Sequence, residues 1–216
     1  MAFALPLEVE ENIIDHLHDH TSTLLDCSMV CKSWIPRARF HLFRSISIRY
    51  KDELDEICNF LDANPSLRSL VRTVTLSGID FCQPELFEVA PIVLLPKLPH
   101  VHQWEFVPSR QRHSRGHMPV LFRSMALHCF SAYLSLRKLR LATITFLRCA
   151  ELGRLLLACT SLDELECVDM GLQRNEPDVC PMLKRRLMSR LHISRLSVSA
   201  AVASIPSHDS HLGFCC

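Results

Sequence analysis

LPLEVEENIIDHLHDHTSTLLDCSMVCKSWIPRARFHLF, residues 5–43, contains three short helical patterns in succession. Pro6 suits the first turn of a helix, because its missing N–H costs nothing there, and acidic residues follow it at the positive end of the helix dipole. Thr21, Ser22 and Thr23 are expected to cap a second helix, with Asp26 three residues after Thr23 as an analogue of a capping box. Pro36 is expected to restart the backbone after Trp34. The segment is therefore predicted to form three helices.

This segment carries more apolar side chains than a unit of its size can bury, because small domains enclose a core poorly. The apolar residues include Leu5, Leu7, Val9, Ile13, Leu17, Leu24, Val30 and Trp34. Large exposed apolar patches usually mark interaction sites, so the surplus predicts a docking role. The alternative is that these side chains pack against the rest of the same chain.

The order and spacing of these residues resemble the fungal-type F-box, the module by which substrate receptors dock onto a Skp-type adaptor in cullin-based (SCF) ubiquitin ligases. Pro6 followed by Glu8, and Val30-Cys31-Lys32 followed by Trp34, are similar to its signature. The resemblance covers only the first fifth of the chain. It implies adaptor contacts at Leu5, Pro6, Leu7, Ile13, Leu24, Val30, Cys31 and Trp34.

A loose repeat follows, of the form apolar-x-x-apolar-x-apolar. It begins at Val71, Val101, Leu136, Leu162 and Ile193, at intervals of 30, 35, 26 and 31 residues. Helix-like stretches separate these strand signals, at residues 85–95, 119–133, 148–158 and 181–190. A short strand followed by a helix, repeated, resembles a leucine-rich repeat, in which stacked neighbours supply the core. A chance alternation inside an ordinary α/β domain is the alternative.

The repeats depart from that family at the turns. The position that normally carries Asn or Cys is occupied by Ile79, Ile144 and Met170, and the apolar residues Phe81, Phe146 and Leu172 follow two positions later. Apolar stacking is therefore expected to hold the turns together, in an irregular solenoid.

The predicted fold class is mainly α with an α/β solenoid: a three-helix F-box, then an irregular leucine-rich-repeat-like strand–helix stack. The expected boundaries are 1–48 for the F-box, 49–66 for a connecting helix or linker, 67–200 for the repeats and 201–216 for an unstructured tail. A repeat stack normally ends in a capping element, which residues 200–216 do not resemble. We therefore expect either a shortened version of a longer repeat protein or a partner that covers the last strand.

Overall composition excludes several classes of function. The balance of 24 basic and 23 acidic residues gives no general attraction to nucleic acid or to membranes. No apolar run approaches membrane-spanning length, and the N-terminus does not resemble a secretory signal. The 11 cysteines are odd in number and scattered, which indicates reduced thiols in the cytoplasm or nucleus.

Charge is unevenly distributed along the chain. Residues 106–150 contain no Asp or Glu, whereas the first sixty residues contain more acidic than basic side chains. A basic surface that could bind an acidic or phosphorylated partner is predicted at Arg110, Arg112, Arg115, Arg137, Lys138 and Arg140. The alternative is a solvated basic surface without a partner.

The sequence offers little for catalysis. Ser114 lies between His113 and His117, but no Gly-x-Ser-x-Gly motif or glycine-rich phosphate loop is present. His16 and His20 could share a helix face as metal ligands do, yet a third ligand is not evident, and a solvated helix end is the preferred interpretation. We therefore expect no enzyme activity, no metal and no cofactor.

These observations predict a substrate-recognition adaptor of an SCF ubiquitin ligase, which binds the Skp-type adaptor through its N-terminal helices and an unknown target protein through its repeats. The first alternative is a protein-binding scaffold that does not cause degradation. A helix-turn-helix nucleic-acid binder is a weaker alternative. Arg37 and Arg39 could serve it, but the surrounding carboxylates would repel phosphate.

Overall fold

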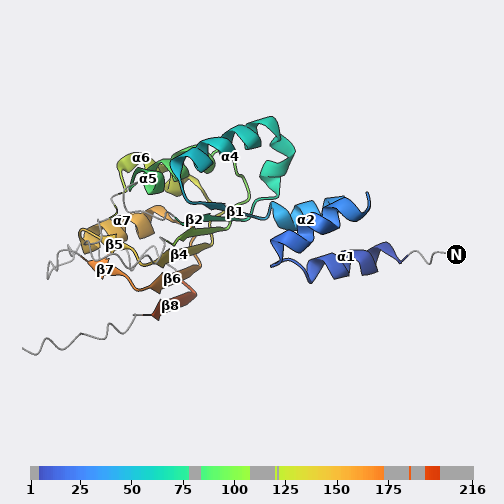
Figure 1. Ribbon diagram of the computed structural model, residues 1–216. Helices are drawn as coiled ribbons and strands as arrows, with labels where there is room; N and C mark the ends of the chain where they lie inside the picture. The colour runs from blue at the N-terminus through green and yellow to red at the C-terminus, as the bar shows by residue number, and fades with distance from the viewer. Residues whose placement is uncertain are drawn as a thin grey trace, which may run out of the picture.

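Figure 1 shows the computed structural model, which describes residues 5–77, 84–107, 120, 122–172, 185 and 193–199. Three N-terminal helices lie beside a parallel sheet, and further helices cover one face of that sheet (Figure 1). The described residues therefore form an α/β structure with a larger share of sheet than the term mainly α implies.

The three N-terminal helices are α1 (Leu7–Asp15), α2 (Thr21–Val30) and α3 (Ile35–Leu42). Pro6 lies immediately before α1, and its carbonyl accepts hydrogen bonds from the backbone N–H groups of Val9 and Glu10, at 3.0 and 3.2 Å. The predicted cap at Thr21, Ser22 or Thr23 is wrong, because α2 already begins at Thr21 and no side chain caps it. Helix α3 restarts the chain with Pro36 in its first turn, as the sequence predicts.

The core of this three-helix unit is small. It consists of Ile14, Leu24, Cys27 and Ala38, against which Leu17, Trp34 and Leu42 pack with part of their surface exposed. Four buried side chains leave most of the apolar residues of the unit outside the core.

The sheet contains six parallel strands in chain order: β1 (Ser45–Ile48), β2 (Thr73–Leu76), β3 (Gln103–Phe106), β4 (Lys138–Ala142), β6 (Glu164–Val168) and β8 (Arg195–Ser199). The second and third apolar positions of each of the five repeat signals lie in one of the last five strands, and the first position lies two residues before it. The sixth strand, β1, was not predicted. It pairs with β2, so the sheet begins inside the range assigned to the F-box.

The helical layer comprises α4 (Lys51–Ala63), α5 (Pro84–Leu94), α6 (Ser124–Ala132) and α7 (Cys149–Ala158), and a 3₁₀ turn at Pro65–Ser69 follows α4. Helix α6 starts later than the predicted 119–133, because Val120 instead forms a bridge to Phe146. The predicted helix at 181–190 lies outside the described residues, apart from Arg185. The predicted tail at 201–216 also lies outside them.

Apolar side chains line up across the sheet on the side of the helices. The first row is Val74, Trp104, Leu139, Leu165 and Leu196, which are paired in register. All but Leu196 are buried. Aromatic rings fill the centre of this core, where Trp104 meets Phe130 edge to face with ring centroids 5.7 Å apart. The described core therefore thins out at β8, where Leu196 is 63% exposed.

The turns after β4 and β6 have the same shape. Thr143 and Asp169 adopt positive φ angles of 52° and 51°, and the short parallel strands β5 (Thr145–Phe146) and β7 (Gly171–Leu172) follow them. Ile144 and Phe146 are buried, in line with the predicted apolar turns, whereas Leu172 is exposed. The predicted turn residues Ile79 and Phe81 lie outside the described residues.

Gly171 permits the close approach of β5 and β7. A Cβ atom at this position would lie 2.9 Å from Thr145 Oγ1, which is too close for any other residue without a shift. The backbone N–H of Gly171 donates to the Ile144 carbonyl at 2.9 Å. Backbone hydrogen bonds therefore support the apolar stacking at this turn.

The three-helix unit joins the sheet without a linker. Helix α3 ends at Leu42 and β1 begins at Ser45. Between them, the Arg44 carbonyl accepts hydrogen bonds from the backbone N–H groups of Arg72 and Thr73, at 2.8 and 3.0 Å. Phe43 stacks on Phe60 of α4 with ring centroids 5.8 Å apart. The junction is therefore fixed on both sides.

Among the described helices, none has the length and apolar character needed to cross a membrane.

Candidate docking surface

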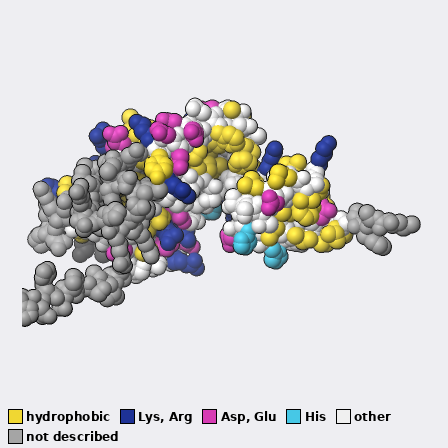
Figure 2. Space-filling view, in the orientation of Figure 1, with side chains coloured by type: hydrophobic (Ala, Val, Ile, Leu, Met, Phe, Trp, Pro, Cys, Tyr) yellow, Lys and Arg dark blue, Asp and Glu magenta, His cyan; other side chains and the backbone are white. Residues whose placement is uncertain are grey.

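Large apolar side chains are exposed on the three-helix unit, and we call these residues the docking surface. Its members are Leu5, Leu7, Val9, Ile13, Leu25, Met29 and Val30, which are 41–76% exposed. Figure 2 shows hydrophobic side chains gathered over this end of the molecule. Such a concentration on a unit with a small core is typical of an interaction site.

Helical spacing explains how the unit divides its apolar residues. On α2, Leu24 and Cys27 point into the core, whereas Leu25 and Met29 are four residues apart and share an exposed face. On α1, Ile14 is buried while the adjacent Ile13 is exposed. On both α1 and α2, one set of apolar side chains therefore builds the core and a second set is exposed.

Six of the predicted contact residues, namely Leu5, Pro6, Leu7, Ile13, Val30 and Cys31, are exposed. Leu24 is only 1% exposed: its side chain lies in the small core of the unit and is not accessible to a partner in this structure. Trp34 is half-buried and packs against the same core.

The structure adds members that the prediction of contacts omitted. Val9, Leu25 and Met29 are exposed, and Met29 is the most exposed of the set at 76%. The four-residue spacing of Leu25 and Met29 could have indicated a shared helix face. The choice between that face and the face of Leu24 depends on how α2 packs, which spacing alone does not specify.

A chain of polar contacts ties the end of α2 to α1 beside this surface. The Cys31 Sγ atom lies 3.0 Å from Ser33 Oγ, and that hydroxyl donates to Glu10 Oε2 at 3.2 Å. The loop that follows α2 and begins at Cys31 is therefore held against α1.

Asp15 links α1 to α3. Arg37 donates two hydrogen bonds to its carboxylate, from Nε to Oδ1 and from Nη2 to Oδ2, each 2.5 Å long. His41 Nε2 lies 2.7 Å from Oδ1. Hydrogen bonds from Arg37, aided by His41, hold the pKa of Asp15 well below its ordinary value. This network was not predicted, although the four-residue spacing of Arg37 and His41 on one helix face could have indicated a shared partner.

The histidines near the end of α1 take structural positions. His16 Nδ1 lies 2.7 Å from the Asn12 carbonyl, and His18 Nδ1 lies 2.9 Å from the Asp15 carbonyl. Both rings can thus cap backbone carbonyls at the helix end. Within the described ranges, no group of three or more His, Cys, Asp or Glu side chains is arranged to hold a metal ion. Ser114, His113 and His117 lie outside those ranges.

The second candidate surface is the face of the sheet opposite the helices. Its charged side chains alternate in sign from strand to strand. Lys138 and Arg195 flank Glu164, at 3.8 and 3.3 Å. One layer along, Arg140 lies 4.0 Å from Glu105 and 3.2 Å from Glu166. Opposite charges on adjacent strands stabilise the register.

This pairing corrects the predicted basic surface. Arg137 lies 3.5 Å from Asp163, and Lys138 and Arg140 each have a carboxylate on the neighbouring strand. The sheet face is therefore a ladder of alternating charges, and these three residues do not form a uniformly basic patch. The other predicted members, Arg110, Arg112 and Arg115, lie outside the described residues.

No family model matches the sequence, and no curated protein matches it either.

Proposed function

We propose that this protein is a substrate-recognition adaptor of an SCF-type ubiquitin ligase. Its three N-terminal helices bind a Skp-type adaptor, and its sheet region binds a target protein. Catalysis takes place on other subunits, and this chain raises the effective concentration of a target lysine near the charged ubiquitin carrier.

The observation that carries this proposal is the docking surface. Seven large apolar side chains are exposed on a unit that fully buries only four residues. Burying a side chain such as Leu or Val is worth roughly 1.5–3 kcal/mol, so a partner that covers several of them gains enough free energy for specific binding. The F-box resemblance supplies the class of partner, and it adds Pro6 and Cys31 to the contact set.

The fixed junction supports the same proposal. A receptor of this kind must hold its target at a defined position relative to the adaptor. Strand β1 follows α3 after two residues, and the Arg44 carbonyl anchors this connection to β2. The ladder of alternating charges on the sheet face supplies polar groups of both signs with which a target can pair.

Arg37 argues against the helix-turn-helix alternative. Its guanidinium is already bound to Asp15 through two hydrogen bonds, so it is not available to a phosphate. The remaining candidate, Arg39, lies on the same short helix, and a single arginine does not make a basic face.

The test is titration calorimetry with a purified Skp-type adaptor. We expect the wild-type chain to bind, and the double variant Leu7→Ser/Val30→Ser to lose at least about tenfold in affinity, because about 1.4 kcal/mol corresponds to a factor of ten. Leu134→Ser is the matched control: Leu134 is an exposed leucine of the sheet region and its loss is expected to leave binding unchanged. A far-UV circular dichroism spectrum checks that each variant is folded.

Two outcomes would contradict the proposal. If the wild-type chain does not bind the adaptor, the ligase assignment fails and the scaffold alternative gains weight. If the wild-type chain binds the adaptor but Leu7→Ser/Val30→Ser binds it as tightly as the control Leu134→Ser does, the docking surface is not the contact. The scaffold alternative also predicts that a target captured through the sheet face is not ubiquitinated in a reconstituted ligase, whereas the adaptor function predicts that it is.

A further inference from the structure

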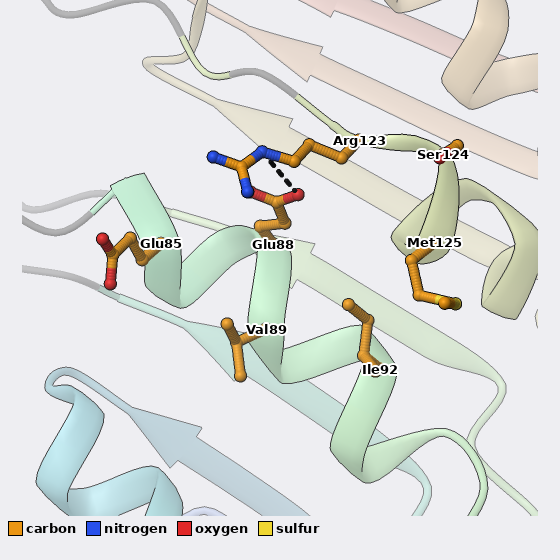
Figure 3. A pocket seen from close by; sticks show the side chains of 7 residues that line it. All are labelled: Glu85, Glu88, Val89, Ile92, Arg123, Ser124 and Met125. Carbon is orange, nitrogen blue, oxygen red and sulfur yellow. Dashed lines mark ion pairs between the residues drawn. The ribbon is translucent and has the colours of Figure 1, made fainter.

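A groove lies between α5 and α6 on the helical layer, separate from the docking surface and from the open sheet face. Figure 3 shows its lining. From α5 come Glu85, Glu88, Val89 and Ile92, and from the start of α6 come Arg123 and Met125. The groove encloses about 490 Å³, which is enough for one or two side chains of another molecule.

The α5 residues of the groove form one stripe along the edge of the core, with Val89 partly buried against it. Leu86, Phe87, Ala90 and Leu94 of the same helix are buried in the main core, whereas Glu85 is exposed and Glu88 and Ile92 are partly buried at the edge of that core. Met125 is 58% exposed beside it. The groove thus combines an apolar end, at Ile92 and Met125, with an acidic end, at Glu85 and Glu88.

The acidic end is only partly neutralised. Arg123 Nε lies 3.3 Å from Glu88 Oε1, and Glu85 has no cation among the groove residues. Two carboxylates and one guanidinium leave a net charge of −1, which favours a cationic ligand. The Glu88 side chain is only 14% exposed, whereas that of Arg123 is 81% exposed. A sheltered carboxylate gains more from a fixed cation than an exposed one, and an ion pair with so exposed a partner costs little to open.

From this geometry we propose that the groove binds an extended peptide segment of a partner protein that carries an arginine and an aliphatic residue two positions apart. The arginine pairs with Glu85 and Glu88, and the aliphatic side chain packs on Ile92 and Met125. Arg123 occupies the place of the incoming arginine in the free protein.

The spacing follows from backbone geometry. Glu88 and Ile92 are four residues apart on α5, a rise of about 6 Å along the helix axis. Side chains at positions i and i+2 of an extended strand point to the same side and are separated by roughly 6.6 Å. Arginine suits the acidic end better than lysine, because its planar guanidinium can bind two carboxylates or one carboxylate in bidentate fashion.

The experiment uses the full chain with ¹³C-labelled Ile and Met methyl groups, titrated with the capped peptide acetyl-Arg-Ala-Ile-amide and, separately, acetyl-Glu-Ala-Ile-amide. We expect saturable shifts of the Ile92 and Met125 methyl signals with the first peptide and none with the second. Glu88→Gln and Glu85→Gln should each weaken binding about five- to tenfold, or roughly 1–1.4 kcal/mol. Arg123→Gln should tighten it about threefold, because it removes the internal competitor.

The Arg123→Gln result separates a binding site from a merely structural ion pair. If the arginine peptide causes no saturable shift, or the glutamate peptide binds as well, the site does not exist as proposed. If Arg123→Gln weakens binding or leaves it unchanged, Arg123 is not a stand-in for a ligand and the proposal is overturned. Glu85 is exposed, so Glu85→Gln keeps the test valid if Glu88→Gln disturbs folding. None of these outcomes depends on adaptor binding, so this inference and the proposed function fail independently.

Discussion

The three-helix unit and the sheet region treat their apolar residues in opposite ways. The helices bury Ile14, Leu24, Cys27 and Ala38 and leave a larger set of apolar side chains exposed. The sheet region buries its apolar rows under α4 to α7 and presents charged side chains on its open face. Incomplete burial leaves apolar surface for a partner to cover, whereas a unit with a full core can offer a polar surface without losing stability. Under the proposed function, this difference suits the first region to adaptor docking and the second to polar contacts with a target.

Trp104→Ala tests whether the sheet region is stable on its own core, and it should have the largest effect. The ring is fully buried at the centre of the aromatic cluster, so its loss should lower the free energy of unfolding by about 3–5 kcal/mol. Urea denaturation followed by circular dichroism measures this change. Trp104→Phe is the control. It keeps a ring in place and removes an N–H group that has no hydrogen-bond partner among the described residues, so it should cost far less.

The adjacent leucines of α2 test the division within the three-helix unit. Leu24→Ala should destabilise the unit by about 2–4 kcal/mol, because it opens a cavity in a core of four residues. Leu25→Ala should change stability by less than about 0.5 kcal/mol, since Leu25 is exposed, yet it should weaken adaptor binding. Hydrogen exchange of the α1 to α3 amides measures the first effect. Equal protection losses in the two variants would erase the distinction between core and surface.

Acidification should weaken the three-helix unit through Asp15. The pKa of its carboxyl is lowered in the folded state, so its contribution is complete above the ordinary value of about 3.9 and is lost as the pH falls below it. With about a third of both side chains exposed, the pair is expected to contribute about 1–2 kcal/mol. Unfolding at pH 7 and pH 3 should show a larger drop for the wild type than for Arg37→Met. Parallel drops in both proteins would show that the pair contributes nothing.

Substitutions in the ladder of alternating charges should have the smallest effect on stability. Arg140→Gln removes the cation between Glu105 and Glu166 and should cost less than about 1 kcal/mol, because partly exposed ion pairs contribute little. Arg140→Glu should cost more, since it places three carboxylates side by side, and added salt should reduce that cost. A salt-independent loss in the Glu variant would indicate a steric cause instead.

The strands could be predicted because their apolar rows recur and the register follows them. The same register could have shown the pairing of the basic residues. Lys138 and Glu164, like Arg140 and Glu166, are 26 residues apart, which is the interval between the repeat signals at Leu136 and Leu162. Counting the charges within one stretch of sequence does not reveal these ion pairs, because the acidic partner of each basic residue lies one repeat away.

Other features could not be predicted for physical reasons. Strand β1 has the sequence SISI, too short for a periodic signal, and its strand state depends on pairing with β2. Leu24 and Leu25 both fit a helical stripe, and only the packing of α2 against α3 determines which one is buried. The groove between α5 and α6 joins residues more than thirty positions apart, and its acidic end is visible only once the two helices lie together.

The short junction between α3 and β1 fixes the position of the sheet relative to the three-helix unit. Only two residues separate α3 from β1, and backbone hydrogen bonds hold them, so each strand lies at a fixed distance from the docking surface. Neighbouring strands are about 4.8 Å apart, so the five steps from β1 to β8 span roughly 24 Å. Under the proposed function, the strand at which a target binds would determine its distance from an adaptor bound at the docking surface.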